Sequence, residues 1–256
     1  MNVCRRYFGH TRRPFALTVV GQKFYVLTDP GDVSKAYKNT TAFSFEIFAE
    51  QLMRTCGCSA LSVRKMFQVP PSNGTSFPNP LRKHFMNLSH DIHTRQLKPG
   101  EGLYTLGMGF AEQFSNHLVL ESLTNAKVSR EDASATSLSR LCSESIVDAA
   151  QNVYFGPHLS QHNPGLTRVF MKFDDQGWQL LFNLPRFLSP TTHSLKDEIV
   201  DAFVDYMETP RDQRAGVAWS IGVLEGEMRQ LGLRNHEMAG MLMIFYWGKV
   251  LDLFNA

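Results

Sequence analysis

The sequence has little excess charge, few cysteines and no long apolar run. Its 26 basic and 24 acidic residues leave a net charge of +2, which is too balanced to predict a positive stripe for nucleic acid. The best apolar stretch, residues 238–248, is shorter than the ~18 to 20 residues that cross a bilayer. We therefore expect no nucleic-acid partner and no membrane anchor within this chain.

The cysteines do not form a pattern typical of a metal or disulfide site. None belongs to a CxxC pair, and no histidine cluster follows them at zinc spacing. Such cysteines are typical of reduced, mostly packed thiols in an intracellular protein. Cys56 and Cys58 have a second interpretation, as a redox pair, because only Gly57 separates them. The four residues are Cys4, Cys56, Cys58 and Cys142.

The first part of the chain predicts a β-hairpin followed by a short helix. Residues 15–20 and 23–28 are rich in β-forming side chains, and Gly21 and Gln22 between them are typical of a two-residue turn. Asp29-Pro30 then supplies an N-cap and a proline at the first helical position. The helix that follows carries an apolar stripe at helical spacing, formed by Val33, Ala36 and Tyr37.

Helices dominate the rest of the chain. Ser44 is expected to cap a second helix that ends at Gly57, and a loop rich in proline, asparagine and glycine occupies residues 70–80. From Leu88 onward the apolar period is almost wholly helical, with one helix stopping at Gly156-Pro157 and others over 165–173, 189–208, 216–231 and 233–254. The predicted fold class is mainly α with a small N-terminal β-hairpin, whose open edges need further cover.

This order of elements resembles the first half of the cytochrome P450 fold. Asp29-Pro30 resembles the start of the family's B helix, Val153-Tyr-Phe-Gly156 the end of its E helix, and residues 184–188 its F–G connection. The apolar run 241–247 is similar to the central I helix of fungal enzymes related to sterol 7α-hydroxylase and prostacyclin synthase. The resemblance implies that residues 1–256 form a single incomplete cytochrome P450 domain, from the first hairpin to the start of the I helix.

A complete member of that family holds haem iron through a cysteine thiolate in a Phe-x-x-Gly-x-x-x-Cys-x-Gly loop. No cysteine of this chain lies in such a frame. The family's Glu-x-x-Arg motif has only a chance match, Glu208-Thr-Pro-Arg211, in which a proline excludes the required helix. We therefore expect a chain that lacks the C-terminal haem-ligand half. It would have no catalytic or metal-ligating residue, would bind no haem stably and would be inactive alone.

The resemblance also implies candidate binding residues. His93 and Arg95 are candidates for contact with a haem propionate, because a guanidinium can pair with a carboxylate. Phe245, Trp247 and Gly248 are candidates for the wall of a substrate pocket. Each has a structural alternative, which is a surface position for the two basic residues and core packing for the aromatic ones.

The function implied by the resemblance is that of a haem-thiolate monooxygenase. The complete enzyme would hydroxylate or rearrange a hydrophobic, lipid-like or steroid-like molecule, using electrons from an NADPH-dependent reductase, and would lie at the endoplasmic-reticulum membrane. The competing hypothesis is a non-enzymatic helical interaction module or the remnant of an enzyme.

Overall fold

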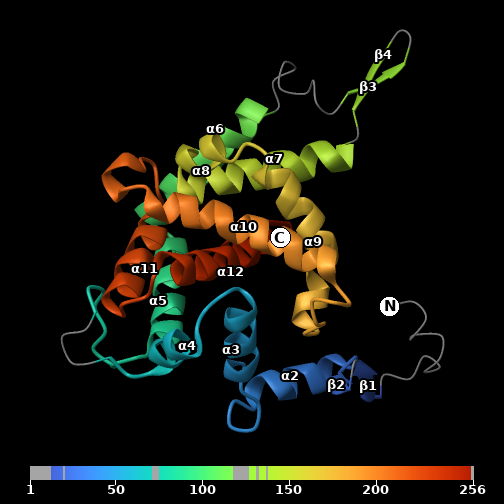
Figure 1. The fold of residues 1–256 in the computed structure, drawn as a ribbon, viewed down its shortest axis with the longest axis vertical. Coiled ribbons are helices and arrows are strands. Elements are labelled where there is room, and N and C mark those ends of the chain that lie inside the picture. Colours follow the sequence, from blue (N-terminus) through green and yellow to red (C-terminus); the bar gives the residue numbers. More distant parts are fainter. Residues whose placement is uncertain are drawn as a thin grey trace.

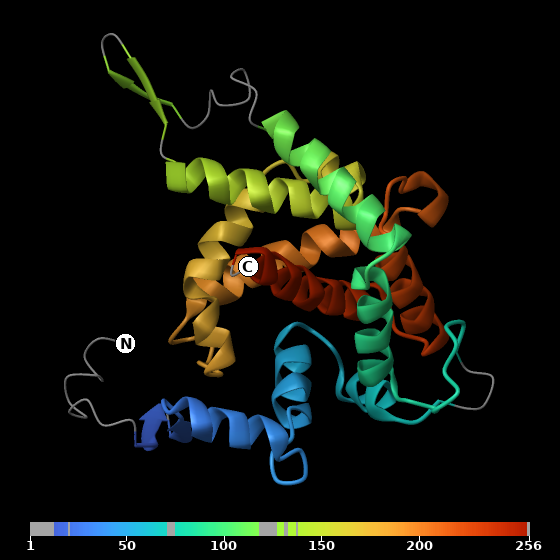
Figure 2. The same ribbon diagram turned by 180° about the vertical axis from the view of Figure 1, so that it is seen from behind.

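The computed structural model describes residues 13–19, 21–70, 75–117, 127–130, 133–136 and 138–254. The fold is mainly helical with a small N-terminal hairpin, as the sequence predicts. Figure 1 shows long helices crossing one another in the centre, with the N-terminal hairpin at one end of the molecule and a second hairpin at the other. The same arrangement is seen from behind in Figure 2.

The N-terminal hairpin joins β1 (Phe15–Val19) to β2 (Gln22–Val26) in an antiparallel pair. Its register pairs Phe15 with Val26 and Val19 with Gln22, so Gln22 belongs to the strand and not, as predicted, to the turn. Gly21 adopts a φ of +79°, a left-handed conformation that glycine accepts without steric cost. No residue described in either strand is fully buried.

Three short helices follow the hairpin. In α2 (Pro30–Lys38), the Asp29 carboxylate accepts hydrogen bonds from the backbone N–H groups of Gly31 and Asp32, at 2.8 and 3.3 Å, which confirms the predicted N-cap. The predicted apolar stripe does not face a core, since Tyr37 is 83% exposed. The chain then forms α3 (Glu46–Thr55) and α4 (Ala60–Phe67). The Glu46 backbone N–H donates to Ser44 Oγ at 3.1 Å, but the N-cap position of α3 is Phe45, one residue after the predicted cap.

The middle of the chain contains α5 (Phe85–Leu97) and α6 (Glu101–His117), followed by a second antiparallel hairpin of β3 (Lys127–Arg130) and β4 (Ala133–Thr136). The prediction that this region is almost wholly helical was wrong here. The two strands are short and polar, without the run of β-branched or aromatic residues from which strands are inferred.

The remaining helices are α7 (Leu138–Phe155), α8 (Pro157–His162), α9 (Leu166–Leu181), α10 (Pro190–Glu208), α11 (Trp219–Gln230) and α12 (Asn235–Phe254), with a 3₁₀ turn at Arg211–Gln213. Gly156 ends α7 with a φ of +75°, and Pro157 opens α8, as predicted. Helix α9 continues eight residues beyond the predicted end at residue 173, because its apolar period extends to Leu180, which is buried. Among the described helices, none combines the length and the hydropathy that a transmembrane span requires.

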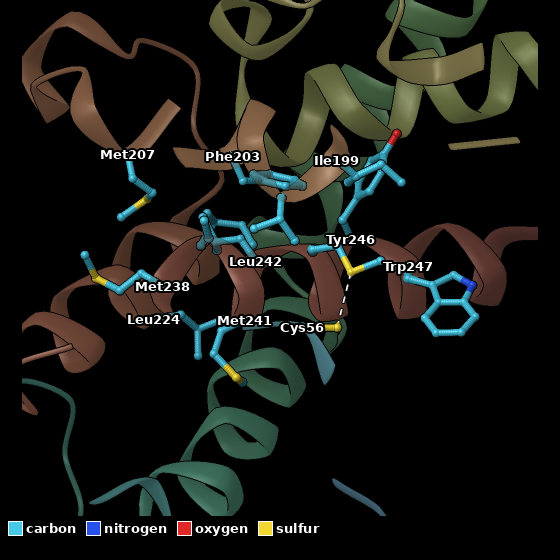
Figure 3. Close-up of a cluster of buried hydrophobic side chains, with 14 of the residues drawn as sticks. Cys56, Ile199, Phe203, Met207, Leu224, Met238, Met241, Leu242, Tyr246 and Trp247 are labelled. Atoms are coloured by element: carbon cyan, nitrogen blue, oxygen red, sulfur yellow. Dashed lines mark hydrogen bonds between the residues drawn. The ribbon is translucent and has the colours of Figure 1, made fainter. Parts of the chain in front are cut away.

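The core surrounds α12. Figures 1 and 3 show α10 lying along α12, with Ile199 and Phe203 of α10 facing Leu242 and Tyr246. All four side chains are at most 1% exposed. A helix that is apolar on every side must be covered on every side, and α12 is covered by α3, α7 and α10.

Candidate functional site

The predicted pocket residues lie on different sides of α12. Two helical positions two residues apart point about 200° away from each other, whereas positions three apart share a face. Trp247 is accordingly buried at 5% exposure, while Phe245 is half-buried and Gly248 is exposed. A single pocket wall therefore cannot include all three.

Trp247 packs α12 against α9. Its indole Nε1 donates a hydrogen bond to Asp174 Oδ1 at 2.9 Å, and its ring meets Phe173 edge to face with centroids 4.9 Å apart. The ring also lies over Gly177, where an added Cβ would come within 2.5 Å of the indole. These contacts explain the burial of Trp247 by the packing of α12 against α9.

Phe245 faces α5 and lies beside His93. The two rings meet edge to face with centroids 5.2 Å apart, and both residues are half-buried. The structure thus brings together one candidate from the predicted haem-contact pair and one from the predicted pocket wall. They come from segments about 150 residues apart in the chain.

Arg95 lies on another side of α5 from His93. Its guanidinium carbon is 5.3 Å from the ring centre of Trp219 and 5.7 Å from that of Phe77, which are distances typical of cation–π contacts. Arg95 therefore faces the start of α11 and the loop before α5, and His93 faces α12. The two side chains therefore point in different directions and do not face a common position for a haem propionate.

Two of the three described cysteines, Cys56 and Cys58, do not fit a haem-thiolate centre. Burial raises the pKa of both the Cys56 and Cys58 thiols to about 12. Cys56 Sγ lies 3.5 Å from Met243 Sδ, and Cys58 Sγ donates to the Glu237 carbonyl oxygen at 3.5 Å. A thiolate is the form that ligates iron, and these two groups are neutral thiols inside a packed core. Cys142 is half-buried on α7, and Cys4 lies outside the described residues.

The structure contains two buried clusters of charged residues that the sequence did not predict. Glu237, at 2% exposure, accepts hydrogen bonds from the Ser59 backbone N–H (3.2 Å), Ser62 Oγ (2.6 Å) and the Arg234 backbone N–H (3.1 Å). Desolvation raises the pKa of this carboxylate, but the hydrogen bonds outweigh it and hold the pKa far below its usual value. Glu237 thereby ties the start of α12 to the start of α4.

The second cluster joins the end of α10 to α11. Arg214 donates to both carboxylate oxygens of Glu225, at 2.8 and 3.0 Å, and its guanidinium stacks 4.5 Å from the ring centre of Tyr206. Tyr206 in turn donates to the Phe155 carbonyl oxygen at 3.1 Å. The first cluster is a helix cap, and the second is a buried ion pair in which Arg214 Nε and Nη1 have no hydrogen-bond partner within the described part of the chain. Among the described residues, no three metal-ligating side chains gather.

Two hollows border Arg95 and Trp219. The larger, of about 830 Å³, runs between α5, α6 and α7, and the smaller, of about 340 Å³, lies between α5, α11 and the loop at residues 76–78. Both Arg95 and Trp219 line both hollows. The sequence made Arg95 a candidate but did not predict its contacts with Phe77 and Trp219.

Comparison with known proteins gives weak, partial similarity to fungal cytochrome P450 monooxygenases. No family model matches the chain. A cytochrome P450 monooxygenase of Humicola fuscoatra, fsoE, is 26% identical over 121 residues, which cover 45% of this chain and 20% of that protein. Another from Penicillium oxalicum, poxD, is 22% identical over 202 residues, covering 77% of this chain and 37% of that protein.

The matched stretches thus span well under half the length of these relatives. They support a distant relationship to the cytochrome P450 monooxygenases, and the family in its complete form uses haem. Neither match bears on the narrower branch similar to sterol 7α-hydroxylase and prostacyclin synthase.

Proposed function

We propose that this chain forms part of the helical scaffold of a haem-thiolate monooxygenase, and that it does not catalyse oxygen insertion by itself. The distant similarity to two fungal cytochrome P450 monooxygenases supports the reaction class. The complete protein would oxidise a hydrophobic small molecule with electrons from an NADPH-dependent reductase, at the endoplasmic-reticulum membrane.

The chemistry of Cys56 and Cys58 supports the second half of the proposal. In this family, a cysteine thiolate donates electron density to the haem iron. Cys56 and Cys58 are fully or almost fully buried, with thiol pKa values of about 12, so at neutral pH each is protonated in all but a very small fraction of molecules. Releasing either sulfur to bind iron would require opening the contact between α3 and α12.

Among the predicted pocket residues and their neighbours, one pair remains a candidate for contact with a substrate. Most of the apolar run 241–247 fills the core, with Met241, Leu242 and Met243 at 0% exposure, so these residues cannot line a pocket without repacking. Phe245 and His93 are half-buried and in contact. We place the substrate-facing surface of the scaffold at this pair, where an aromatic wall suits a lipid-like or steroid-like molecule.

A spectroscopic measurement tests the inactivity of the isolated chain. The purified chain is mixed with haem, reduced and exposed to carbon monoxide, beside a complete fungal cytochrome P450 as positive control. We expect no thiolate-type Soret band and no substrate oxidation when a reductase is added. A thiolate-type band that disappears on replacing one of the four cysteines with serine would contradict the proposal.

One surface favours the second candidate, a helical interaction module. The 17-residue helix α6 has no buried residue, and Leu103, Tyr104 and Met108 on it are 37%, 67% and 54% exposed. Apolar surface of this kind marks binding sites. Analytical ultracentrifugation of the chain and of a Tyr104→Glu, Met108→Glu variant tests it. A defined dimer that becomes monomeric in the variant would support self-association through α6.

A further inference from the structure

The smaller hollow beside Arg95 has the features of a binding site for an organic anion. We propose that it binds a small aromatic anion, that is, a single flat ring carrying a phosphate or carboxylate group. The hollow has a volume of about 340 Å³ and lies between α5, α11 and the loop at residues 76–78. It is separate from the buried thiols and from the pair of His93 and Phe245, so it does not depend on the monooxygenase proposal.

Two guanidinium groups line the hollow. Arg95 comes from α5, and Arg211 comes from the 3₁₀ turn before α11. Neither forms an ion pair with a carboxylate within the part of the chain that the structure describes. Guanidinium groups recognise phosphate and carboxylate oxygens through parallel N–H donors, and two of them suit a group with several anionic oxygens.

Aromatic rings hold Arg95 in place. Its guanidinium lies over both Phe77 and Trp219, and these two rings meet edge to face with centroids 6.0 Å apart. Stacking occupies the face of the guanidinium and leaves its N–H edge available for an anion. Trp219 remains 43% exposed, so it can also stack with the ring of a ligand.

The loop that forms one wall is fixed from inside the protein. Glu227, at 2% exposure, accepts hydrogen bonds at one oxygen from the backbone N–H groups of Ser76 and Phe77, each at 2.7 Å. Gln230 of the same helix donates to Ser76 Oγ. The charge of Glu227 is therefore directed toward the loop backbone, and the wall that carries Phe77 is set before any ligand arrives.

Two glycines on α11 shape the floor. A Cβ on Gly222 would lie 2.4 Å from Arg211 Nη2, so the absence of a side chain there lets the guanidinium lie against the helix. A Cβ on Gly226, one turn later, would meet no atom within 4 Å. Gly226 therefore leaves open space beside the two arginines, and a side chain placed there would fill it.

The size of the hollow selects the class of ligand. Small-molecule sites commonly measure about 300 to 1,000 Å³, and this one lies at the lower end of that range. It suits one ring with its anionic group. The aromatic walls and paired cations favour such a molecule over a bare inorganic ion.

Ligand-observed NMR with phenyl phosphate tests the proposal on the full chain, with benzyl alcohol and inorganic phosphate as separate probes. We expect phenyl phosphate to bind most tightly and its affinity to fall as salt is added. Arg95→Gln and Arg211→Gln should each weaken it about tenfold or more, since each removes hydrogen bonds to a charged group. Arg64→Gln, an exposed arginine on α4, is the matched control and should leave the affinity unchanged.

Gly226→Leu provides a second variant that keeps both arginines. Leucine is a better helix former than glycine, so this variant should fold, and it should abolish binding by filling the hollow. Thermal unfolding of each variant checks the fold. Binding of phenyl phosphate that survives all three substitutions would overturn the proposal, as would equal affinity for inorganic phosphate or for benzyl alcohol, or no binding of phenyl phosphate to the unsubstituted chain.

Discussion

The N-terminal segment and the central helices were both predicted from local sequence patterns, yet only the central helices form a core. In β1, β2 and α2 no described residue is fully buried, and Tyr25 and Tyr37 are 73% and 83% exposed. In the centre, Phe203 and Leu242 are fully buried. Figure 1 shows the difference directly, with the N-terminal segment at the edge of the molecule and α10 and α12 in its middle.

An apolar stripe determines an element and its buried face only where a partner exists to cover that face. In α2 the local signals suffice, because the Asp29 cap and Pro30 fix where the helix begins. Its apolar side chains nevertheless remain in solvent. In α12 the cover comes from α3, α7 and α10, which are remote in sequence, and burial supplies most of the stability.

The largest expected effect comes from truncating one aromatic residue in each region. Phe203→Ala removes a fully buried ring that contacts Phe155 and Tyr246, and should lower the free energy of unfolding by about 3 to 5 kcal/mol. Tyr37→Ala should change it by no more than about 0.5 kcal/mol, since the ring is exposed. Urea denaturation followed by circular dichroism measures both. Similar losses for the two variants would refute the contrast between the regions.

The next effect compares two helix caps, one buried and one exposed. Glu237→Gln should lower the free energy of unfolding by about 1.5 to 3 kcal/mol at neutral pH, which is the range for hydrogen bonds to a charged group. Asp29→Asn should leave the free energy of unfolding nearly unchanged, because asparagine caps a helix as well as aspartate does.

The buried cap also predicts a pH dependence. The pKa of Glu237 is lower in the folded chain than its usual value of 4.5, so its stabilising effect is present above pH 4.5 and is lost as the pH falls below it. Denaturation at a series of pH values should show a steeper acid loss for the unsubstituted chain than for Glu237→Gln. Parallel curves would show that the cap is not linked to folding.

Local structure was the part of the fold that could be predicted from the sequence. The first hairpin, the Asp29 cap, the stop at Gly156-Pro157 and most later helices follow from turn residues, caps and apolar spacing. The second hairpin was missed because its strands are short and polar. Which faces are buried was not accessible, because burial depends on contacts between segments far apart in the chain.

The candidate site shows the same limit. Resemblance drew attention to His93, Arg95, Phe245, Trp247 and Gly248, but not to their directions. The contact between His93 and Phe245 and the placement of Arg95 on Trp219 both depend on how α5 packs against α11 and α12. The role of Trp247 depends on Asp174 and Gly177 of α9. Spacing along one helix indicates that such residues diverge, but not what each of them meets.

A smaller effect tests how tightly the central helices are packed. A Cβ on Gly240 would lie 2.3 Å from the Cys56 carbonyl oxygen, whereas one on Gly226 would meet nothing within 4 Å. Gly240→Ala should therefore destabilise the chain by about 1 to 3 kcal/mol through overpacking of α12 against α3. Gly226→Ala should be neutral or stabilise by up to about 1 kcal/mol. Thermal unfolding of this matched pair distinguishes a close backbone approach from mere glycine flexibility.

The smallest effect concerns how the N-terminal segment is attached to the rest. Phe24 of β2 meets Phe182, just after α9, edge to face with centroids 4.8 Å apart. Such a pair contributes about 0.5 to 1.5 kcal/mol beyond its buried area. Phe24→Ala should therefore leave global unfolding almost unchanged while hydrogen exchange accelerates in residues 15–26. If exchange instead accelerates in α10 and α12 as well, the hairpin belongs to the same cooperative unit as the core. In that case the hairpin, although exposed, helps to hold α9 in place.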